Sequence, residues 1–160
     1  MGLGGTVDVD SLAELQLMSL SLMNNNFSGP FPYNDLKKLG KLRSLYLAND
    51  IFNGDIPYDD AFSGMKAMRK IVLEFNEYTG KIPMSLLQLL RLVDLQLPSN
   101  QFEGRIPDFW QKNLTVNFAN KKLEGPIPST LGSQNASKFS GKSEMINLNS
   151  YIYMLDLARL

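Results

Sequence analysis

One eight-residue motif recurs along this chain and constrains its fold more than any other feature. The motif places asparagine two residues before an aromatic side chain, glycine two residues after it, and then an apolar residue followed by proline. Four clear copies, spaced by 24 to 26 residues, end at Pro32, Pro57, Pro83 and Pro107. A weaker fifth copy ends at Pro128 after a step of 21 residues. Each copy follows an apolar run of the type L-x-x-L-x-L, as in residues 92–97.

A repeat of this length with this leucine spacing is typical of a leucine-rich-repeat solenoid, in which each repeat adds a short strand to a parallel sheet. Alternate strand residues face inward, so Leu45 and Leu47 are expected in the core and Tyr46 on the exposed face. The predicted fold class is an α/β repeat of the plant type. It has a curved parallel β-sheet on its concave face and short 3-10, helical or extended segments on its convex side.

The repeat also suggests boundaries along the chain. Leu3, Gly5 and Val7 fit the aromatic, glycine and apolar positions of a repeat whose strand is missing, so we expect residues 1–8 to be the remnant of a truncated N-terminal repeat. Residues 9–131 are expected to form a solenoid of about five repeats, and residues 132–160 a divergent tail that could hold one degenerate strand.

The asparagine of each motif is expected to belong to a structural ladder, because its amide can bond backbone groups that a turn leaves unpaired. The ladder positions are Asn25, Asp50, Asn76, Asn100 and Lys121. Asp50 keeps the acceptor of asparagine but lacks the donor, and Lys121 can only donate. An unsatisfied buried group costs roughly 1–3 kcal/mol. We therefore predict that Asp50→Asn raises the melting temperature.

The composition argues against catalysis. The chain has 16 basic and 16 acidic residues, so no overall field attracts nucleic acid or an anionic membrane. It has neither cysteine nor histidine, which excludes cysteine nucleophiles, the usual zinc ligands and the commonest general base. Asp55, Asp59 and Asp60 match no calcium loop and are interpreted as solvated. We expect no enzymatic activity, no cofactor, no nucleic-acid partner and no direct insertion into a membrane.

The outward strand positions form the candidate ligand surface, because arginine and tyrosine often anchor protein interfaces. The candidate ligand-binding residues are Arg43, Tyr46, Arg69, Lys70, Val72, Glu74, Asp94 and Gln96. An acidic or mixed-charge peptide could pair with Arg43, Arg69 and Lys70, although the same residues could equally form a solvated sheet face. Candidate N-glycosylation sites lie at Asn26, Asn113 and Asn135.

Four segments of the chain resemble the extracellular domain of plant receptor-like kinases, specifically the pollen receptor-like kinases. They are residues 1–8, 60–65, 91–97 and 111–120. The resemblance implies a parent receptor with a signal peptide, cysteine-paired caps, a membrane helix and a cytoplasmic kinase. The repeats of such a receptor lie at the extracellular face of the plasma membrane. Since this sequence carries none of those flanking parts, we expect it to be the ligand-binding part of a receptor. The subcellular location of this chain itself stays open.

The same resemblance implies the partners. Receptors of this family receive secreted, often cysteine-rich peptides, with a possible co-receptor, and so promote pollen-tube growth. The leading hypothesis is therefore a non-catalytic, peptide-binding ectodomain segment. Two alternatives stay open: a secreted leucine-rich-repeat inhibitor of a cell-wall-degrading enzyme, and a non-functional gene fragment.

Overall fold

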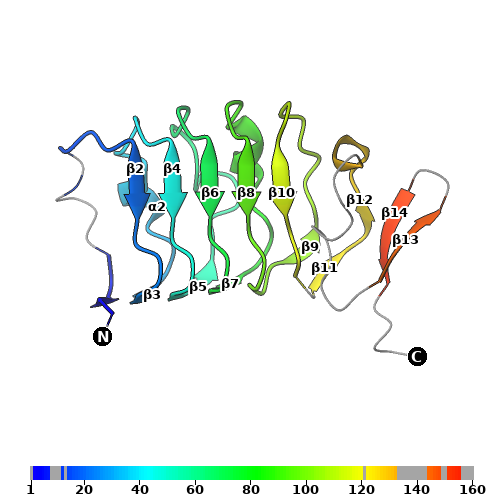
Figure 1. Ribbon diagram of the computed structural model, residues 1–160, viewed down its shortest axis with the longest axis horizontal. Helices are drawn as coiled ribbons and strands as arrows, with labels where there is room; N and C mark the ends of the chain where they lie inside the picture. The colour runs from blue at the N-terminus through cyan, green and yellow to red at the C-terminus, as the bar shows by residue number, and fades with distance from the viewer. Residues whose placement is uncertain are drawn as a thin grey trace.

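The computed structural model describes residues 2–7, 12, 14–120, 122–132, 144–148 and 151–155. The repeats follow one another along the long axis of the molecule, and their strands stand side by side (Figure 1). The fold class predicted from the repeat, a leucine-rich-repeat solenoid built on parallel strands, is confirmed.

The concave face is a parallel sheet, which has five strands among the described residues, in the order β10-β8-β6-β4-β2. The strands are β2 (Ser19–Ser21), β4 (Ser44–Tyr46), β6 (Lys70–Val72), β8 (Asp94–Gln96) and β10 (Thr115–Asn117). Leu45 lies in register with Leu20 on one side and Ile71 on the other. All three side chains are buried, as the leucine spacing predicts, because the middle residue of each three-residue strand faces the core.

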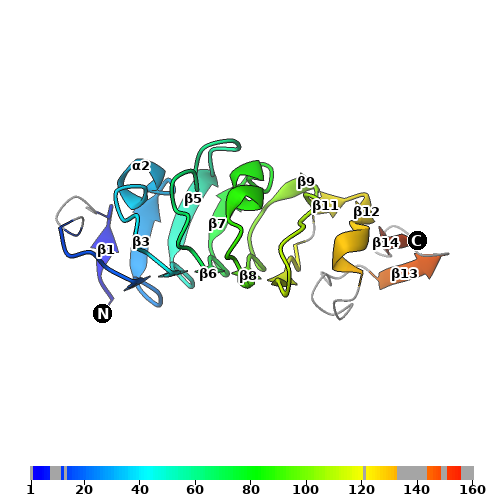
Figure 2. The same cartoon turned by 90° about the horizontal axis from the view of Figure 1, so that it is seen from above.

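A second set of strands forms the lateral side of the solenoid (Figures 1 and 2). Strands β1 (Gly4–Gly5), β3 (Asn26–Gly29), β5 (Ile51–Asp55) and β7 (Glu77–Thr79) make one parallel sheet. Strands β9 (Glu103–Arg105) and β11 (Lys122–Glu124) pair separately. The motif glycine of one repeat aligns with the motif aromatic of the next, as Gly54 does with Tyr78. Gly5 aligns with Phe27 in the same way, which supports a preceding repeat at residues 1–8, although these boundaries stay a prediction.

The convex side is built from short segments that start after the motif prolines. They are the helical turn α2 (Tyr33–Leu36), the 3-10 helix η1 (Met84–Gln88) and the 3-10 helix η2 (Ser129–Leu131). Near the C-terminus, β12 (Pro126–Ile127) pairs with β14 (Tyr151–Leu155), which in turn pairs with β13 (Glu144–Leu148). Both pairings are antiparallel, unlike the parallel addition of a further repeat strand.

An aromatic stack runs through the core beneath the two sheets. The rings of Phe27, Phe52, Tyr78 and Phe102 follow one another with centroids 6.2–6.3 Å apart and interplanar angles of 4–20°. Offset stacks of this spacing are favourable beyond their burial alone. The stack thus joins four consecutive repeats through the aromatic residues of their motifs.

Candidate functional site

Four side chains on the concave face form a continuous strip across three repeats. The Nζ atom of Lys70 lies 5.7 Å from the centre of the Tyr46 ring and 2.7 Å from the Asp94 carboxylate. Asp94 also accepts a hydrogen bond from the side-chain amide of Gln96. We call Tyr46, Lys70, Asp94 and Gln96 the concave strip. Their contacts hold the side chains in place from β4 through β6 to β8.

The charge pair within the strip is only partly exposed. The hydrogen bond from Lys70 to the Asp94 carboxylate raises the pKa of Lys70 above its ordinary value. Lys70 was expected to act with Arg43 and Arg69 on an acidic ligand, but its ammonium group is already bound to Asp94. Its first role in the structure is therefore to connect Tyr46 to Asp94.

The structure contradicts the expectation that Val72 is an exposed binding residue. Its side chain is only 5% exposed. In the sheet Val72 lies in register between Tyr46 and Gln96, whose larger side chains flank a short branched one. Glu74 lies just beyond the end of β6 and is half-buried. An outward position in a strand is thus not always an accessible one.

Three arginines gather at the edge of the sheet where the concave strands begin. Arg43, Arg69 and Arg91 line a hollow of about 430 Å³ together with Ala67 and Val93. All three arginines are exposed. Within the described part of the chain none of their guanidinium groups has an ion-pair partner. We call this feature the arginine hollow; Arg91 was not among the residues chosen from the sequence.

The ladder positions lie between the two sheets and bind backbone groups of two repeats. Asn76 accepts a hydrogen bond from the Phe52 amide at 3.1 Å and donates to the carbonyls of Leu47 at 2.6 Å and Leu73 at 3.2 Å. Asn100 likewise accepts from the Tyr78 amide. Its own amide donates to the carbonyls of Leu73 and Leu97. Asn25 accepts from Leu3 and donates to Leu22. The ladder thus bonds each repeat to its neighbour.

Asp50 makes only half of these bonds. Its Oδ1 accepts from the Phe27 amide at 2.9 Å, while its buried Oδ2 finds no hydrogen-bond partner among the residues that the structure describes. Burial raises the pKa of Asp50, against the opposing effect of the backbone hydrogen bonds that it accepts. The buried Tyr78 hydroxyl also has no partner. Among the described ladder residues, Asp50 is therefore the one with an unsatisfied buried polar atom.

The last ladder position differs from the sequence expectation. Lys121 lies outside the described residues. Asn120, one residue earlier, accepts from the Asn100 amide at 2.9 Å and donates to the Leu97 carbonyl at 3.2 Å. Asn120 is 2% exposed. Counting back two residues from Leu123 misses it, because Asn120 stands three residues before Leu123, whereas Asn100 stands two before Phe102. The asparagine beside the expected position was the available signal.

The remaining candidate sites are the glycosylation asparagines and the acidic residues Asp55, Asp59 and Asp60. Asn26 and Asn113 are exposed, and Asn135 lies outside the described residues. Asp60 is bound by Lys37 and Ser63, and Asp55 accepts from the Thr79 hydroxyl. No group of three or more potential ligand side chains placed to hold a metal ion occurs in the described ranges. None of the helices found there has the length and apolarity that crossing a membrane requires.

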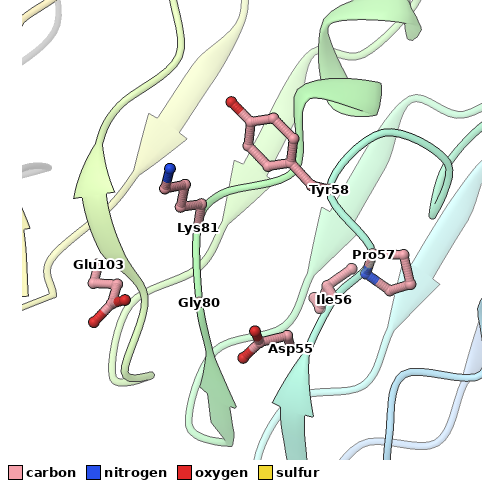
Figure 3. Close-up of a pocket in the computed structure, with 7 residues that line it drawn as sticks. All are labelled: Asp55, Ile56, Pro57, Tyr58, Gly80, Lys81 and Glu103. Atoms are coloured by element: carbon pink, nitrogen blue, oxygen red, sulfur yellow. The ribbon is translucent and has the colours of Figure 1, made fainter.

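A second hollow lies on the lateral side of the solenoid (Figure 3). It has a volume of about 520 Å³ and is lined by Asp55, Ile56, Pro57, Tyr58, Gly80, Lys81 and Glu103. Figure 3 shows Tyr58 beside Lys81, with Asp55 and Glu103 farther along the wall. Its charges have both signs, so it selects no ligand charge as clearly as the arginine hollow does.

Comparison with known proteins shows what the repeats are similar to. No protein-family model matches the sequence. Pollen receptor-like kinase 2 of Arabidopsis thaliana is 42% identical over 140 residues, which are 87% of this chain and 21% of that protein. Pollen receptor-like kinase 4 of the same plant is 46% identical over 147 residues, with shares of 91% and 21%. The chain thus spans about one fifth of the length of these relatives.

Solved structures agree with these relatives. The crystal structure of a pollen receptor kinase 3 matches 84% of this chain and 65% of its own length, with a TM-score of 0.77 and 38% identity. The Arabidopsis receptor kinase HAESA, solved with the peptide hormone IDA and the co-receptor SERK1, matches 95% of this chain and 26% of its own, with a TM-score of 0.77 and 29% identity. Over about nine tenths of its length the chain is thus homologous to pollen receptor-like kinases, and it matches the leucine-rich-repeat ectodomain of such receptors.

Proposed function

We propose that this chain is the ligand-binding part of a plant receptor kinase that senses a secreted peptide or small protein in pollen-tube growth. The solved HAESA complex contains a peptide hormone and a co-receptor, and partners of these two kinds are proposed for this chain. The relatives found are receptor kinases, so the receptor is favoured over an inhibitor of a cell-wall-degrading enzyme.

The observation that carries this proposal is the concave strip. Its members contact one another across three repeats, from the Tyr46 ring through Lys70 and Asp94 to Gln96. Ordering a free side chain at an interface costs about 0.5–1.5 kcal/mol. Side chains that already hold one another lose less on binding, so the strip is prepared to receive an extended partner.

The proposed role is binding without catalysis. The sequence contains no histidine or cysteine, and the charged groups of the strip are bound to each other in an open sheet. The kinase activity named for the relatives is therefore not proposed for these repeats. Their part is to turn the presence of a ligand into an altered association with a co-receptor.

The experiment is a binding panel with matched variants. Secreted peptides from pistil and pollen are titrated against the chain by isothermal calorimetry, and the best binder is then measured on the double variant Tyr46→Ala/Gln96→Ala. We expect at least a tenfold loss of affinity, about 1.4 kcal/mol. The lateral double variant Lys122→Ala/Glu124→Ala, at exposed positions on β11, should bind as the unmodified chain does.

Two results would contradict the proposal. One is a panel in which no peptide binds. The other is a ligand whose affinity falls in the lateral variant while the concave variant binds normally.

A further inference from the structure

We infer that the arginine hollow is a binding site for the carboxylate groups of an acidic peptide segment. The inference deepens the proposed function, on which it rests in one respect: the acidic segment is taken to belong to the ligand of the concave strip.

The backbone sets the arginines close together. The amide of Arg69 donates to the carbonyl of Arg43 at 2.8 Å, and the amide of Val93 donates to the carbonyl of Arg69 at 2.9 Å. Arg43 and Arg69 therefore occupy the same place in adjacent repeats, and neighbouring strands of a sheet are separated by about 4.8 Å. Arg91, two residues before Val93, adds its side chain to the same hollow from the third repeat.

Within the described residues, no acidic side chain compensates the charge of the hollow. Its five lining residues include three arginines and no carboxylate. Asp94, an acidic residue next in sequence to Val93, is held by Lys70 at 2.7 Å. Like charges around one open space repel each other, and an anion placed among them relieves that repulsion. The ion pair in the strip thus leaves the arginines available for an external anion.

The chemistry favours carboxylates carried on side chains. A guanidinium group presents a planar fork of donors that matches a carboxylate in a bidentate pair. Three guanidinium groups can accommodate more than one such group. Ala67 and Val93 give the hollow an aliphatic part, which suits the methylene stem of glutamate. A volume of about 430 Å³ has room for a few side chains.

The hollow also borders the concave strip. Arg69 and Lys70 are consecutive residues, as are Val93 and Asp94. A ligand that lies on the strip can therefore extend an acidic segment into the hollow. This differs from the grouping expected from sequence: Lys70 belongs to the strip, and Arg91 takes its place among the anion-binding cations.

The test follows the arginine side chains directly by NMR. The isotope-labelled chain is titrated with a capped Ala-Glu-Ala-Glu-Ala peptide and with its glutamine counterpart, and the Nε–Hε signals are recorded. We expect the signals of Arg43, Arg69 and Arg91 to shift with the glutamate peptide alone, and the affinity to fall as salt is added. Arg69→Ala should weaken binding at least tenfold.

Arg105 provides the matched control. It is an exposed arginine of the lateral side, whose side chain lies over Gly125. Arg105→Ala should bind the glutamate peptide within twofold of the unmodified chain. Melting curves of both variants establish that each is folded.

Each outcome decides the inference. Equal shifts with both peptides, or no shift of the three signals, would overturn it. A response to inorganic phosphate or sulfate without one to the glutamate peptide would overturn the carboxylate assignment and favour a phosphate or sulfate ester. The variant Tyr46→Ala/Gln96→Ala could bind the glutamate peptide while no secreted peptide in the panel binds the unmodified chain. That result would contradict the proposed function and support the carboxylate site in the hollow.

Discussion

The asparagine ladder and the concave strip cross the same repeats, yet they use their side chains differently. Asn76 is buried and bonds to backbone groups of two repeats, so the fold depends on it. Lys70 and Gln96 lie on the open face and contact other side chains. A buried polar group that loses its partner is costly, whereas most exposed substitutions change stability little. The repeat thus separates the residues that stabilise the solenoid from those available to a ligand.

The largest expected effect is at the ladder. Asn76→Ala removes the acceptor for the Phe52 amide and the donor for the Leu47 and Leu73 carbonyls. We expect the free energy of unfolding in urea to fall by about 3 kcal/mol, because several buried backbone groups lose their partner. Gln96→Ala, on the strip, should change it by less than about 0.5 kcal/mol. Equal losses in the two variants would remove the distinction between ladder and strip.

The second effect concerns the lateral sheet. Gly80 has a φ of +71°, and a Cβ there would lie 2.7–2.9 Å from the Asp55 carboxylate atoms. We expect Gly80→Ala to lower the free energy of unfolding by about 1–2 kcal/mol, since a side chain is disfavoured in the left-handed region. Gly40→Ala is the control, because nothing lies within 4 Å of a Cβ at that position. Ligand affinity should be unchanged in both, and a loss in Gly80→Ala alone would move the binding site toward the lateral side.

A smaller effect, of opposite sign, is expected at the unsatisfied ladder position. Asp50→Asn supplies a donor in place of the orphaned Oδ2 and should raise the free energy of unfolding by about 1 kcal/mol. Asp59→Asn, at an exposed position, should leave it within about 0.5 kcal/mol. No gain in Asp50→Asn would mean that the carboxylate finds a partner in solution.

The stability difference between Asp50→Asn and the unmodified chain should also depend on pH. Burial raises the pKa of Asp50 above 3.8, so the folded chain holds a proton there more tightly than the unfolded chain. The stabilisation from that proton is fully present below pH 3.8 and is lost as the pH rises through the folded-state pKa. The advantage of Asp50→Asn over the unmodified chain should therefore be larger near pH 7 than near pH 4. Unfolding at the two pH values measures it, and an advantage that shrinks as the pH rises would contradict the account.

The smallest effect is at Phe75, which has a φ of +54° and is 56% exposed. The corresponding positions of two other repeats hold Asn24 and Asn49, with φ of 63° and 57°. Asparagine tolerates this conformation better than a bulky residue does. Phe75→Asn should therefore raise the free energy of unfolding by about 0.5 kcal/mol. A clear fall in the melting temperature of Phe75→Asn would show that the Phe75 ring makes stabilising contacts within the fold.

Much of the fold could be predicted from the sequence, because the residue pattern within one repeat indicates which side chains face the core and which bond the turn. The leucine spacing places Leu45 and Leu95 inward, and the ladder bonds of Asn76 and Asn100 follow from the chemistry of an amide in a turn. The pairing of Lys70 with Asp94 was not predicted, because it depends on the register between repeats and on side-chain conformation.

The candidate site was less predictable than the fold. Alternation along a strand predicts which way a side chain points and not how exposed it is. It therefore identified Val72 as a binding residue, although Val72 is buried between the strands of Tyr46 and Gln96. Arg91 stands three residues before its strand, whereas Arg43 and Arg69 stand one residue before theirs. Its place in the same hollow therefore does not follow from its position in the repeat, and the structure was needed to show it.

The most direct test of the central claim is an NMR map of backbone amide shifts with and without the best peptide from the binding panel. The account predicts the largest changes at Ser44–Tyr46, Lys70–Val72 and Asp94–Gln96, the three strands that carry the concave strip. Changes concentrated at Glu77–Thr79 and Glu103–Arg105, on the lateral side, would contradict it.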